Sequence, residues 1–261
     1  MSKKAAVLIG INYKGTENQL NGCENDINDM KSILIRRFGF KAENVLVLME
    51  GEKIPTRENI LNAMNWLVEK NKQGYDDLWF QYSGHGTHIE DRSGDEADGQ
   101  DEAMVTSDLK LVLDDEIYSN LIKPLPSSCN LVAIMDCCHS GSILDLRYKY
   151  CGGSYNSNDN MRCKATANII ALSGCMDNQT SADAVFQKRW NGALTKNLIR
   201  LFHMSNFKLT CNSLMINLIN NLKRGGFTQF PQMTCSRPLN ANIMFCNLGY
   251  KGKHESRPYL C

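Results

Sequence analysis

Two short segments of the sequence combine the residue types that nucleophilic catalysis requires. The first is Tyr82-Ser-Gly-His-Gly-Thr-His88, in which two glycines flank His85. The second is Met135-Asp-Cys-Cys-His-Ser-Gly141, which follows an apolar run and contains the adjacent Cys137 and Cys138. A thiol becomes an effective nucleophile at neutral pH only where a base or a cation lies beside it. A cysteine of the second segment and His85 would supply such a pair.

The same residue types leave other interpretations open. Buried cysteines often act as small hydrophobic residues, and a loop histidine often makes only a structural hydrogen bond. A zinc site is the competing metal interpretation, with Cys137, Cys138, His139 and His88 as its ligands. Adjacent cysteines lack the usual spacing of zinc ligands, which disfavours that site.

Strand periodicity helps to choose between the two cysteines. Side chains alternate along a strand, so residues two apart share a face. If the extended backbone continues past the apolar run, Asp136 and Cys138 point to one side and Cys137 points to the other. Ser83 and His85 form a similar pair on the earlier strand. The pattern therefore predicts that Cys138 faces a cleft while Cys137 packs in the core.

Apolar runs and helical periodicities alternate along the chain and predict an α/β fold. The predicted strands cover residues 5–10, 45–49, 77–82, 129–135, 168–172 and 242–245, and the predicted helices cover 23–38, 56–70, 193–202 and 213–222. Strands separated by helices imply right-handed crossovers and a mostly parallel sheet between two helical layers. Ligands bind beyond the carboxyl ends of such strands, which indicates the loops after Gly10, Tyr82, Met135 and Leu172.

Composition disfavours several functional classes. The net charge of +1 gives no reason to expect nucleic acid or a membrane surface as a partner. No apolar run approaches the length of a membrane span, and the N-terminus has no signal-peptide pattern. The 11 cysteines are odd in number and irregularly spaced, which argues against a disulfide scaffold. We therefore expect reduced thiols and a cytoplasmic protein.

The two motifs YSGHG and DCCHSG resemble the catalytic segments of the metacaspases, which are caspase-like cysteine peptidases. The segments AVLIGINY, LNGCENDI, DGQDE, SGCMDNQTSADA and GALT are also similar to metacaspase segments, so the resemblance covers about residues 5–250. It implies a three-layer α/β/α caspase-like fold in a single peptidase domain over residues 1–261. In that domain, residues 1–146 correspond to the large-subunit-like half, 147–164 to a flexible linker loop, 165–250 to the small-subunit-like half and 251–261 to a tail.

The resemblance assigns catalytic and specificity roles by position. Cys138 matches the nucleophile, His85 matches the general base and acid, and the backbone N–H groups of Gly86 and Cys138 match the oxyanion hole. The residues that match the acidic S1 pocket, which receives the substrate side chain before the cleaved bond, are Cys23, Asp26, Ser83 and Asp136. Two carboxylates suit a guanidinium and repel an aspartate, so cleavage after arginine or lysine is expected.

The resemblance also implies calcium as an activator and no organic cofactor. The matching aspartates are Asp101, Asp114, Asp115 and Asp145. Calcium prefers several hard carboxylate oxygens, but the spacing does not fit an EF-hand. On the residues alone, a solvated acidic loop with Asp114 near a helix N-terminus is the alternative.

The combined expectation is a calcium-dependent cysteine endopeptidase that acts on protein or peptide substrates through an acyl-enzyme. Basic residues of the linker loop are candidate self-cleavage sites: Arg147, Lys149, Arg162 and Lys164. The chain lacks a long prodomain and a long linker, so it is closest to a type I metacaspase without a prodomain. The resemblance to the family also implies a monomer and a role in programmed cell death. The alternatives are a non-catalytic scaffold of the same fold that binds basic peptides, or a peptidase specific for asparagine or aspartate.

Overall fold

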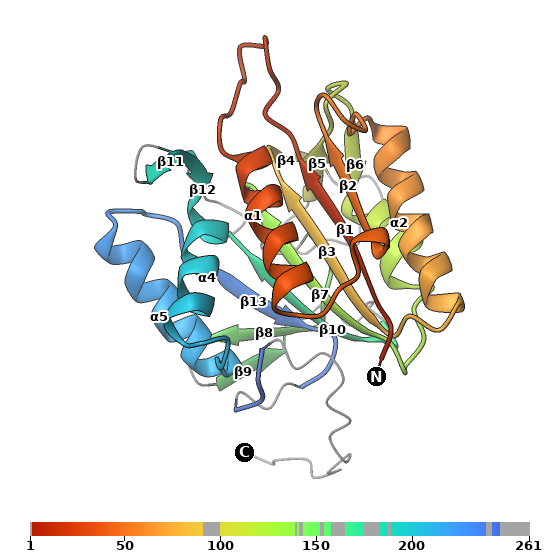
Figure 1. Cartoon of the computed structure of the whole chain (residues 1–261), viewed down its shortest axis with the longest axis vertical. Coiled ribbons are helices and arrows are strands. Elements are labelled where there is room, and N and C mark those ends of the chain that lie inside the picture. The colour runs from red at the N-terminus through yellow and green to blue at the C-terminus, as the bar shows by residue number, and fades with distance from the viewer. Residues whose placement is uncertain are drawn as a thin grey trace.

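The fold is built on one mixed β-sheet. The computed structural model describes residues 2–90, 100–138, 140, 143–151, 154–157, 165–174, 183–186, 189–238 and 242–245. The strands of the main sheet are β1 (Lys4–Gly10), β2 (Val45–Met49), β3 (Asp77–Ser83), β7 (Asn130–Asp136), β8 (Tyr148–Cys151), β9 (Ser154–Ser157), β10 (Asn168–Ser173) and β13 (Gln232–Cys235). They lie in the order β2-β1-β3-β7-β10-β13-β8-β9 (Figure 1).

Helices cover both faces of this sheet and complete a three-layer α/β/α architecture. One face carries α1 (Cys23–Arg36), α4 (Ala193–Met204) and α5 (Cys211–Arg224), which lie side by side in Figure 1. The other face carries α2 (Arg57–Lys72), the short α3 (Asp114–Ile117) and the π-helical turn η2 (Tyr118–Ile122). The 3-10 turn η1 (Ala42–Asn44) leads into β2. No helix of the described residues is long and apolar enough to cross a membrane.

The first five strands of the sheet are parallel, and this determines where loops converge. β2, β1, β3, β7 and β10 pair in parallel, while β13 is antiparallel to β10. In register, Ser83 of β3 lies opposite Gly10 of β1 and Asp136 of β7. The segments that follow these three residues therefore leave the sheet at one edge, as the alternating sequence pattern predicts.

Most predicted helices and strands are confirmed, because long apolar or amphipathic segments are strong signals of secondary structure. The structure contains all five of the predicted strands between residues 5 and 172, and all four predicted helices, with small shifts at their ends. Thr56 caps α2, as expected: its hydroxyl accepts the Asn59 backbone N–H at 3.3 Å. The parallel sheet between two helical layers is confirmed as well.

Two predictions about the second half of the chain are wrong. Residues 242–245 form no strand; Met244 makes only an isolated bridge to Thr210, and Phe245 packs among the helices instead. The strand beside β10 is β13, which sequence periodicity missed. The 147–164 segment is not an irregular loop throughout, because β8 and β9 extend the main sheet.

Two small antiparallel sheets were also not predicted. One contains β4 (Gly86–Glu90), β5 (Gln100–Val105) and β6 (Leu111–Leu113), and the other contains β11 (Asp183–Phe186) and β12 (Arg189–Gly192). The described part of the acidic 90–102 segment thus includes strand structure. β4 is largely exposed and polar, so its pairing with β5, rather than an apolar pattern, determines its conformation.

Candidate active site

The backbones of the two motif segments are in direct contact. The Gly84 backbone N–H donates to the Asp136 carbonyl oxygen at 3.3 Å. A Cβ atom on residue 86 would overlap the carbonyl oxygen of Cys138, so only glycine fits at this point. The parallel pairing of β3 with β7 therefore places His85 and Cys138 on adjacent loops, although 53 positions separate them in the sequence.

The two cysteines have different environments. Cys137 is fully buried in the same core cluster as Ala133 and Met135, so it continues the packing side of β7. Cys138 is half-buried, and Asp136 lies on the opposite face of the strand from Cys137. The predicted packing position of Cys137 is confirmed.

A pair of buried tyrosines holds the backbone of His85. The Tyr13 hydroxyl accepts the His85 backbone N–H at 2.9 Å, and the Tyr82 hydroxyl donates to the His85 carbonyl oxygen at 2.7 Å. The two hydroxyls lie 3.0 Å apart, and burial raises the pKa of both tyrosines, which therefore stay neutral. The position of His85 is thus fixed by groups on β3 and on the loop after β1.

The same loop orients the imidazole ring of His85. Nε2 lies 2.7 Å from the Asn18 carbonyl oxygen, and the ring packs against Tyr13 with centroids 4.7 Å apart. A carbonyl oxygen only accepts hydrogen bonds, so Nε2 carries a proton in this contact. In the neutral ring, Nδ1 is then the atom that can accept a proton. Sequence reasoning did not identify Tyr13 or Asn18, whose loop was noted only as lying beyond a strand end.

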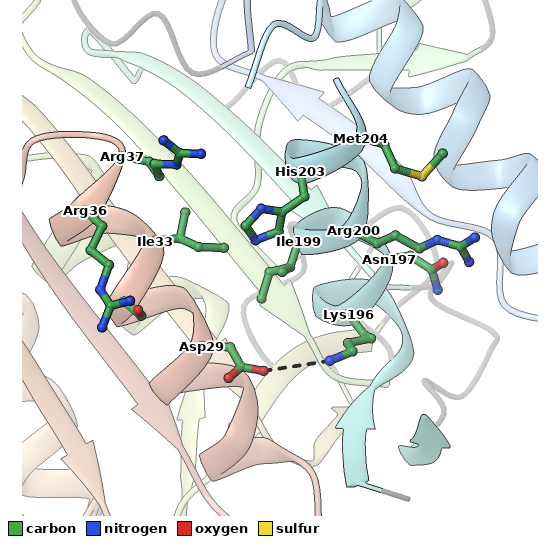
Figure 2. Close-up of a pocket in the computed structure, with 11 residues that line it drawn as sticks. Asp29, Ile33, Arg36, Arg37, Lys196, Asn197, Ile199, Arg200, His203 and Met204 are labelled. Atoms are coloured by element: carbon green, nitrogen blue, oxygen red, sulfur yellow. Dashed lines mark ion pairs between the residues drawn. The ribbon is translucent and has the colours of Figure 1, made fainter. Parts of the chain in front are cut away.

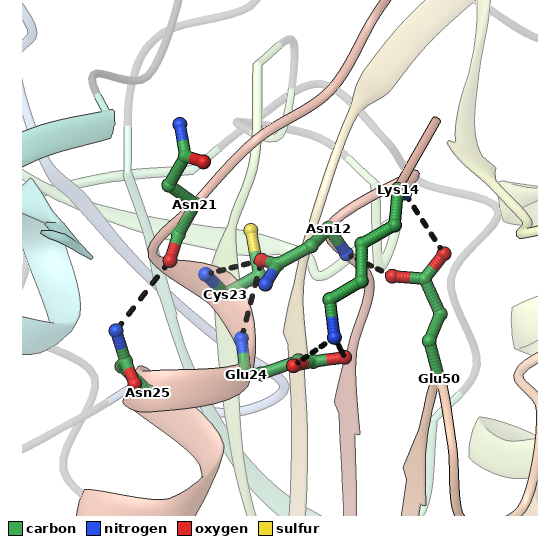
Figure 3. A network of polar contacts seen from close by, with 7 residues as sticks. All are labelled: Asn12, Lys14, Asn21, Cys23, Glu24, Asn25 and Glu50. Carbon is green, nitrogen blue, oxygen red and sulfur yellow. Dashed lines mark hydrogen bonds and ion pairs between the residues drawn. The ribbon is translucent and has the colours of Figure 1, made fainter. Parts of the chain in front are cut away.

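Polar contacts connect that loop to the start of α1 (Figure 3). The residue preceding α1 is Gly22, which offers no side-chain cap. The Asn12 side-chain oxygen accepts the backbone N–H groups of Cys23 and Glu24 at 3.1 and 3.4 Å instead. Lys14 forms an ion pair with Glu24 at 2.7 Å. Asn12 thus caps α1 from the loop that precedes it and fixes the helix whose first turn contains Cys23 and Asp26.

The two predicted pocket carboxylates meet at the beginning of α4. Asp26 Oδ2 accepts the Gly192 backbone N–H at 2.9 Å, and Asp136 Oδ2 accepts the Thr195 backbone N–H at 2.8 Å. A Cβ atom on Gly192 would overlap an oxygen of each carboxylate, so both acids lie against this one glycine. The structure therefore brings together Asp26 and Asp136, as predicted.

Additional acceptor atoms surround these carboxylates. The Ser83 hydroxyl is 1% exposed and has no hydrogen-bond partner among the described residues, and Ser83 lies opposite Asp136 in the sheet register. The Asn191 side chain donates to Asp26 at 2.9 Å, while its own oxygen is buried and accepts no hydrogen bond from the part of the chain that the structure describes. Sequence reasoning missed Asn191 and Gly192, although Gly192 begins the GALT segment. Two carboxylates, a hydroxyl and an amide oxygen therefore lie together here, and these oxygens can accept hydrogen bonds from a ligand that brings several N–H groups.

The four predicted calcium aspartates do not form a metal site in this structure. Asp114 accepts the backbone N–H groups of Glu102 and Asp115, at 2.8 and 2.7 Å. Asp101 is buried, Asp115 is exposed and Asp145 is half-buried. Among the described residues, no three His, Cys, Asp or Glu side chains gather in a geometry that holds a metal ion. The calcium site therefore stays a prediction, and so does the zinc alternative, because His139 lies outside the described residues.

Candidate self-cleavage residues are only partly covered by the structure. Arg147 is exposed and immediately precedes β8, whereas Lys149 lies within β8 and pairs with Thr234 of β13. Arg162 and Lys164 lie outside the described residues.

The six cysteines with described side chains form no disulfide, and burial raises the pKa of Cys129 and Cys211 to about 12. These two thiols are therefore inert packing residues at neutral pH.

Comparison with known proteins identifies the family. Residues 3–147 match the family model of the metacaspase peptidase C14 domain. The chain belongs to the metacaspases. This family consists of cysteine peptidases, so the expected enzyme class, a hydrolase without an organic cofactor, is confirmed.

Curated metacaspases are similar over most of this chain. Metacaspase-1 of Schizosaccharomyces pombe is 36% identical over 92% of this chain and 69% of its own length. Metacaspase-1 of Cryptococcus neoformans is 35% identical over 93% of this chain and 64% of its own length. The chain thus spans about two thirds of the relatives that it matches.

Solved structures confirm the caspase-like fold. A protein from Geobacter sulfurreducens superposes with a TM-score of 0.67 at 26% identity, covering 93% of this chain and 96% of that one. Caspase-1 from Spodoptera frugiperda superposes with a TM-score of 0.59 at 12% identity, covering 89% of this chain and 86% of that one. The second likeness concerns the fold alone.

The contact between Gly86 and Cys138 leads to a first prediction. Gly86→Ala places a methyl group against the Cys138 carbonyl oxygen and forces the two loops apart. We expect peptidase activity to fall about a hundredfold, because displacing a nucleophile by about 1 Å has an effect of that size. Hydrolysis assays and thermal unfolding of the variant test this. Wild-type activity in a folded Gly86→Ala protein would contradict the contact.

Proposed function

We propose that this metacaspase hydrolyses peptide bonds after arginine or lysine, with Cys138 as the nucleophile and His85 as the general base and acid. The main support for this proposal is that the Asp26 and Asp136 carboxylates both lie against Gly192. They do so at the same sheet edge as the two motif loops. Asp136 connects the acidic pocket to the proposed nucleophile, because it is one of the two carboxylates and lies two residues before Cys138.

The reaction begins with a proton transfer from the Cys138 thiol to Nδ1 of His85. The thiolate attacks the carbonyl carbon of the substrate, and the backbone N–H groups of Gly86 and Cys138 stabilise the negative charge that develops on the carbonyl oxygen. The imidazolium then donates its proton to the leaving amine as the C–N bond breaks. Water, deprotonated by His85, attacks the resulting thioester and releases the acid product together with the free thiol.

The contacts of His85 support this assignment. The Asn18 carbonyl oxygen accepts from Nε2, which leaves Nδ1 available in the neutral ring and stabilises the imidazolium after the transfer. The tyrosine pair holds the backbone of His85 and limits rotation of the loop. These contacts preorganise the base before a substrate binds.

The pocket composition favours a basic substrate side chain. A guanidinium has five N–H donors and no acceptor, which complements two carboxylates, the Ser83 hydroxyl and the Asn191 side-chain oxygen. A lysine ammonium has three donors and would satisfy fewer of these atoms. An aspartate side chain would place a third negative charge among acceptors. We therefore propose the preference arginine over lysine, with asparagine and aspartate rejected.

A panel of fluorogenic peptides with Arg, Lys, Asn or Asp before the cleaved bond tests this proposal. Asp136→Asn keeps an oxygen that can accept the Thr195 N–H, so the fold should persist. We expect kcat/KM for the Arg peptide to fall about a hundredfold, because leaving the buried guanidinium without its partner charge costs roughly 3 kcal/mol. Glu58→Gln is the control: it removes one negative charge from an exposed position in the first turn of α2, outside both the pocket and the α1–α4 surface, and should leave hydrolysis unchanged.

Other outcomes of the panel decide against the proposal. Selective cleavage after Asn or Asp would contradict the acidic pocket. No turnover of any peptide, with retained binding of basic peptides, would favour the non-catalytic scaffold.

We also propose that calcium activates the enzyme and triggers self-cleavage within residues 147–164. The resemblance to metacaspases supports calcium activation, whereas the arrangement of the four aspartates gives it no support. Incubating wild-type and Cys138→Ala proteins with calcium or with EDTA separates the two effects. We expect faster hydrolysis with calcium, and a chain cut only in wild type. Equal activity in EDTA would contradict activation, and full activity of an intact chain would show that self-cleavage is not required. Cytoplasmic location and a monomeric state stay predictions.

A further inference from the structure

The outer surface between α1 and α4 contains a groove of about 1050 Å³ with a basic rim (Figure 2). Arg36 and Arg37 lie on one side, at the end of α1, and Lys196 and His203 of α4 point toward α1 from the other. Arg200 of α4 also lines the groove, with its side chain directed away from α1. This set of residues is called the α1–α4 groove below. It lies on the face of the sheet that α5 also covers, and it includes neither catalytic residue.

The sequence builds the groove from two matching helical stripes. Asp29, Ile33 and Arg36 lie one turn apart along α1, and Lys196, Arg200 and His203 lie one turn apart along α4. Asp29 pairs with Lys196 at 3.9 Å at one end, and at the other end Phe38, which follows α1, packs on Phe202 in the last turn of α4 with ring centroids 5.5 Å apart. The two helices therefore run parallel and face each other over about two turns.

The groove has an excess of positive charge that neighbouring residues do not neutralise. Asp29 pairs with Lys196, and Arg37 stacks over Phe207 at 4.8 Å. Arg36 and Arg200 are exposed and form no ion pair with any residue that the structure describes.

The helix dipoles explain only part of this charge. Basic residues are favoured in the last turn, at the negative end of a helix dipole, which accounts for the positions of Arg36 and His203. Lys196 lies in the first turn of α4, where its ion pair with Asp29 accounts for it, but Arg200 lies in the middle of the helix, where the dipole gives no reason for a cation. The excess therefore indicates an anionic ligand.

The shape of the groove selects the kind of anion. Its cations extend over about two helical turns, roughly 10 Å, which corresponds to three residues of extended chain. Ile33 and Ile199 form an apolar floor, and Met204 is 69% exposed at the mouth. A compact phosphate group would contact one or two cations and leave the apolar floor uncovered. A short acidic peptide with an apolar side chain would use both the rim and the floor.

We propose that the α1–α4 groove docks an acidic segment, containing an apolar residue, of the protein substrate. This rests on the proposed peptidase function. The groove begins one helical turn from the pocket carboxylates, since Asp29 follows Asp26 on α1 and Lys196 follows Thr195 on α4. A segment held there keeps the rest of the substrate near the active site and raises its effective concentration.

Fluorescence anisotropy with a labelled Glu-Leu-Glu-Glu-Leu peptide tests the docking step alone. We expect wild type to bind it, with affinity that falls as salt rises, and to ignore the peptide with Gln in place of Glu. Arg36→Gln/Arg200→Gln should weaken binding about tenfold, because two exposed ion pairs are lost. Lys223→Gln/Arg224→Gln removes the same charge from exposed positions on α5 and should bind like wild type.

Three results would overturn the docking proposal: no binding to wild type, equal binding of the Gln peptide, or inorganic polyphosphate competing as strongly as the acidic peptide. A second assay joins the acidic segment to an Arg cleavage site and compares it with the Gln version. The acidic substrate should have the lower KM in wild type and in the α5 variant, and this difference should vanish in Arg36→Gln/Arg200→Gln. Peptide binding without hydrolysis of any Arg substrate would contradict the proposed function and not the groove.

Discussion

The parallel pairing of β3 with β7 is the constraint on which the rest of the site depends. It places Ser83 opposite Asp136 and brings two loops, far apart in the sequence, into backbone contact at Gly86 and Cys138. Strand alternation then separates the side chains that follow. Cys137 enters the core, while Asp136 faces the helical layer of α1 and α4. One sheet register thus positions the carboxylate of Asp136, the packing residue Cys137 and the proposed nucleophile Cys138.

The pocket carboxylates also connect the two halves of the chain. Asp26 and Asp136 accept backbone N–H groups at the start of α4, where the helix dipole favours negative charge. They therefore help to anchor α4 while offering acceptor atoms to a basic side chain. Because α4 also forms one side of the α1–α4 groove, the proposed docking site and the proposed S1 pocket share the same support.

Local patterns in the sequence predicted the parts of the site that a single element determines. The strand ends and the packing of Cys137 follow from apolar runs and from the alternation of side chains along a strand, whereas the roles of His85 and Cys138 are implied by the resemblance to metacaspases. The partners of buried polar groups did not follow, because tertiary structure determines them. Asn191 meets Asp26 across 165 positions, and Asn12 caps α1 from the preceding loop. The strand prediction for residues 242–245 is wrong because tertiary packing again decides the structure: the apolar side chains of this segment pack on helices and do not form a strand.

The central claim is that Cys138, and not its neighbour Cys137, attacks the substrate. The most direct measurement compares hydrolysis of an Arg peptide by Cys137→Ala and Cys138→Ala, with mass spectrometry of wild type after reaction with an arginyl chloromethyl ketone. The account predicts that Cys137→Ala keeps most of the activity, that Cys138→Ala has none, and that the label is on Cys138. An active Cys138→Ala protein, or a label on Cys137, would contradict it.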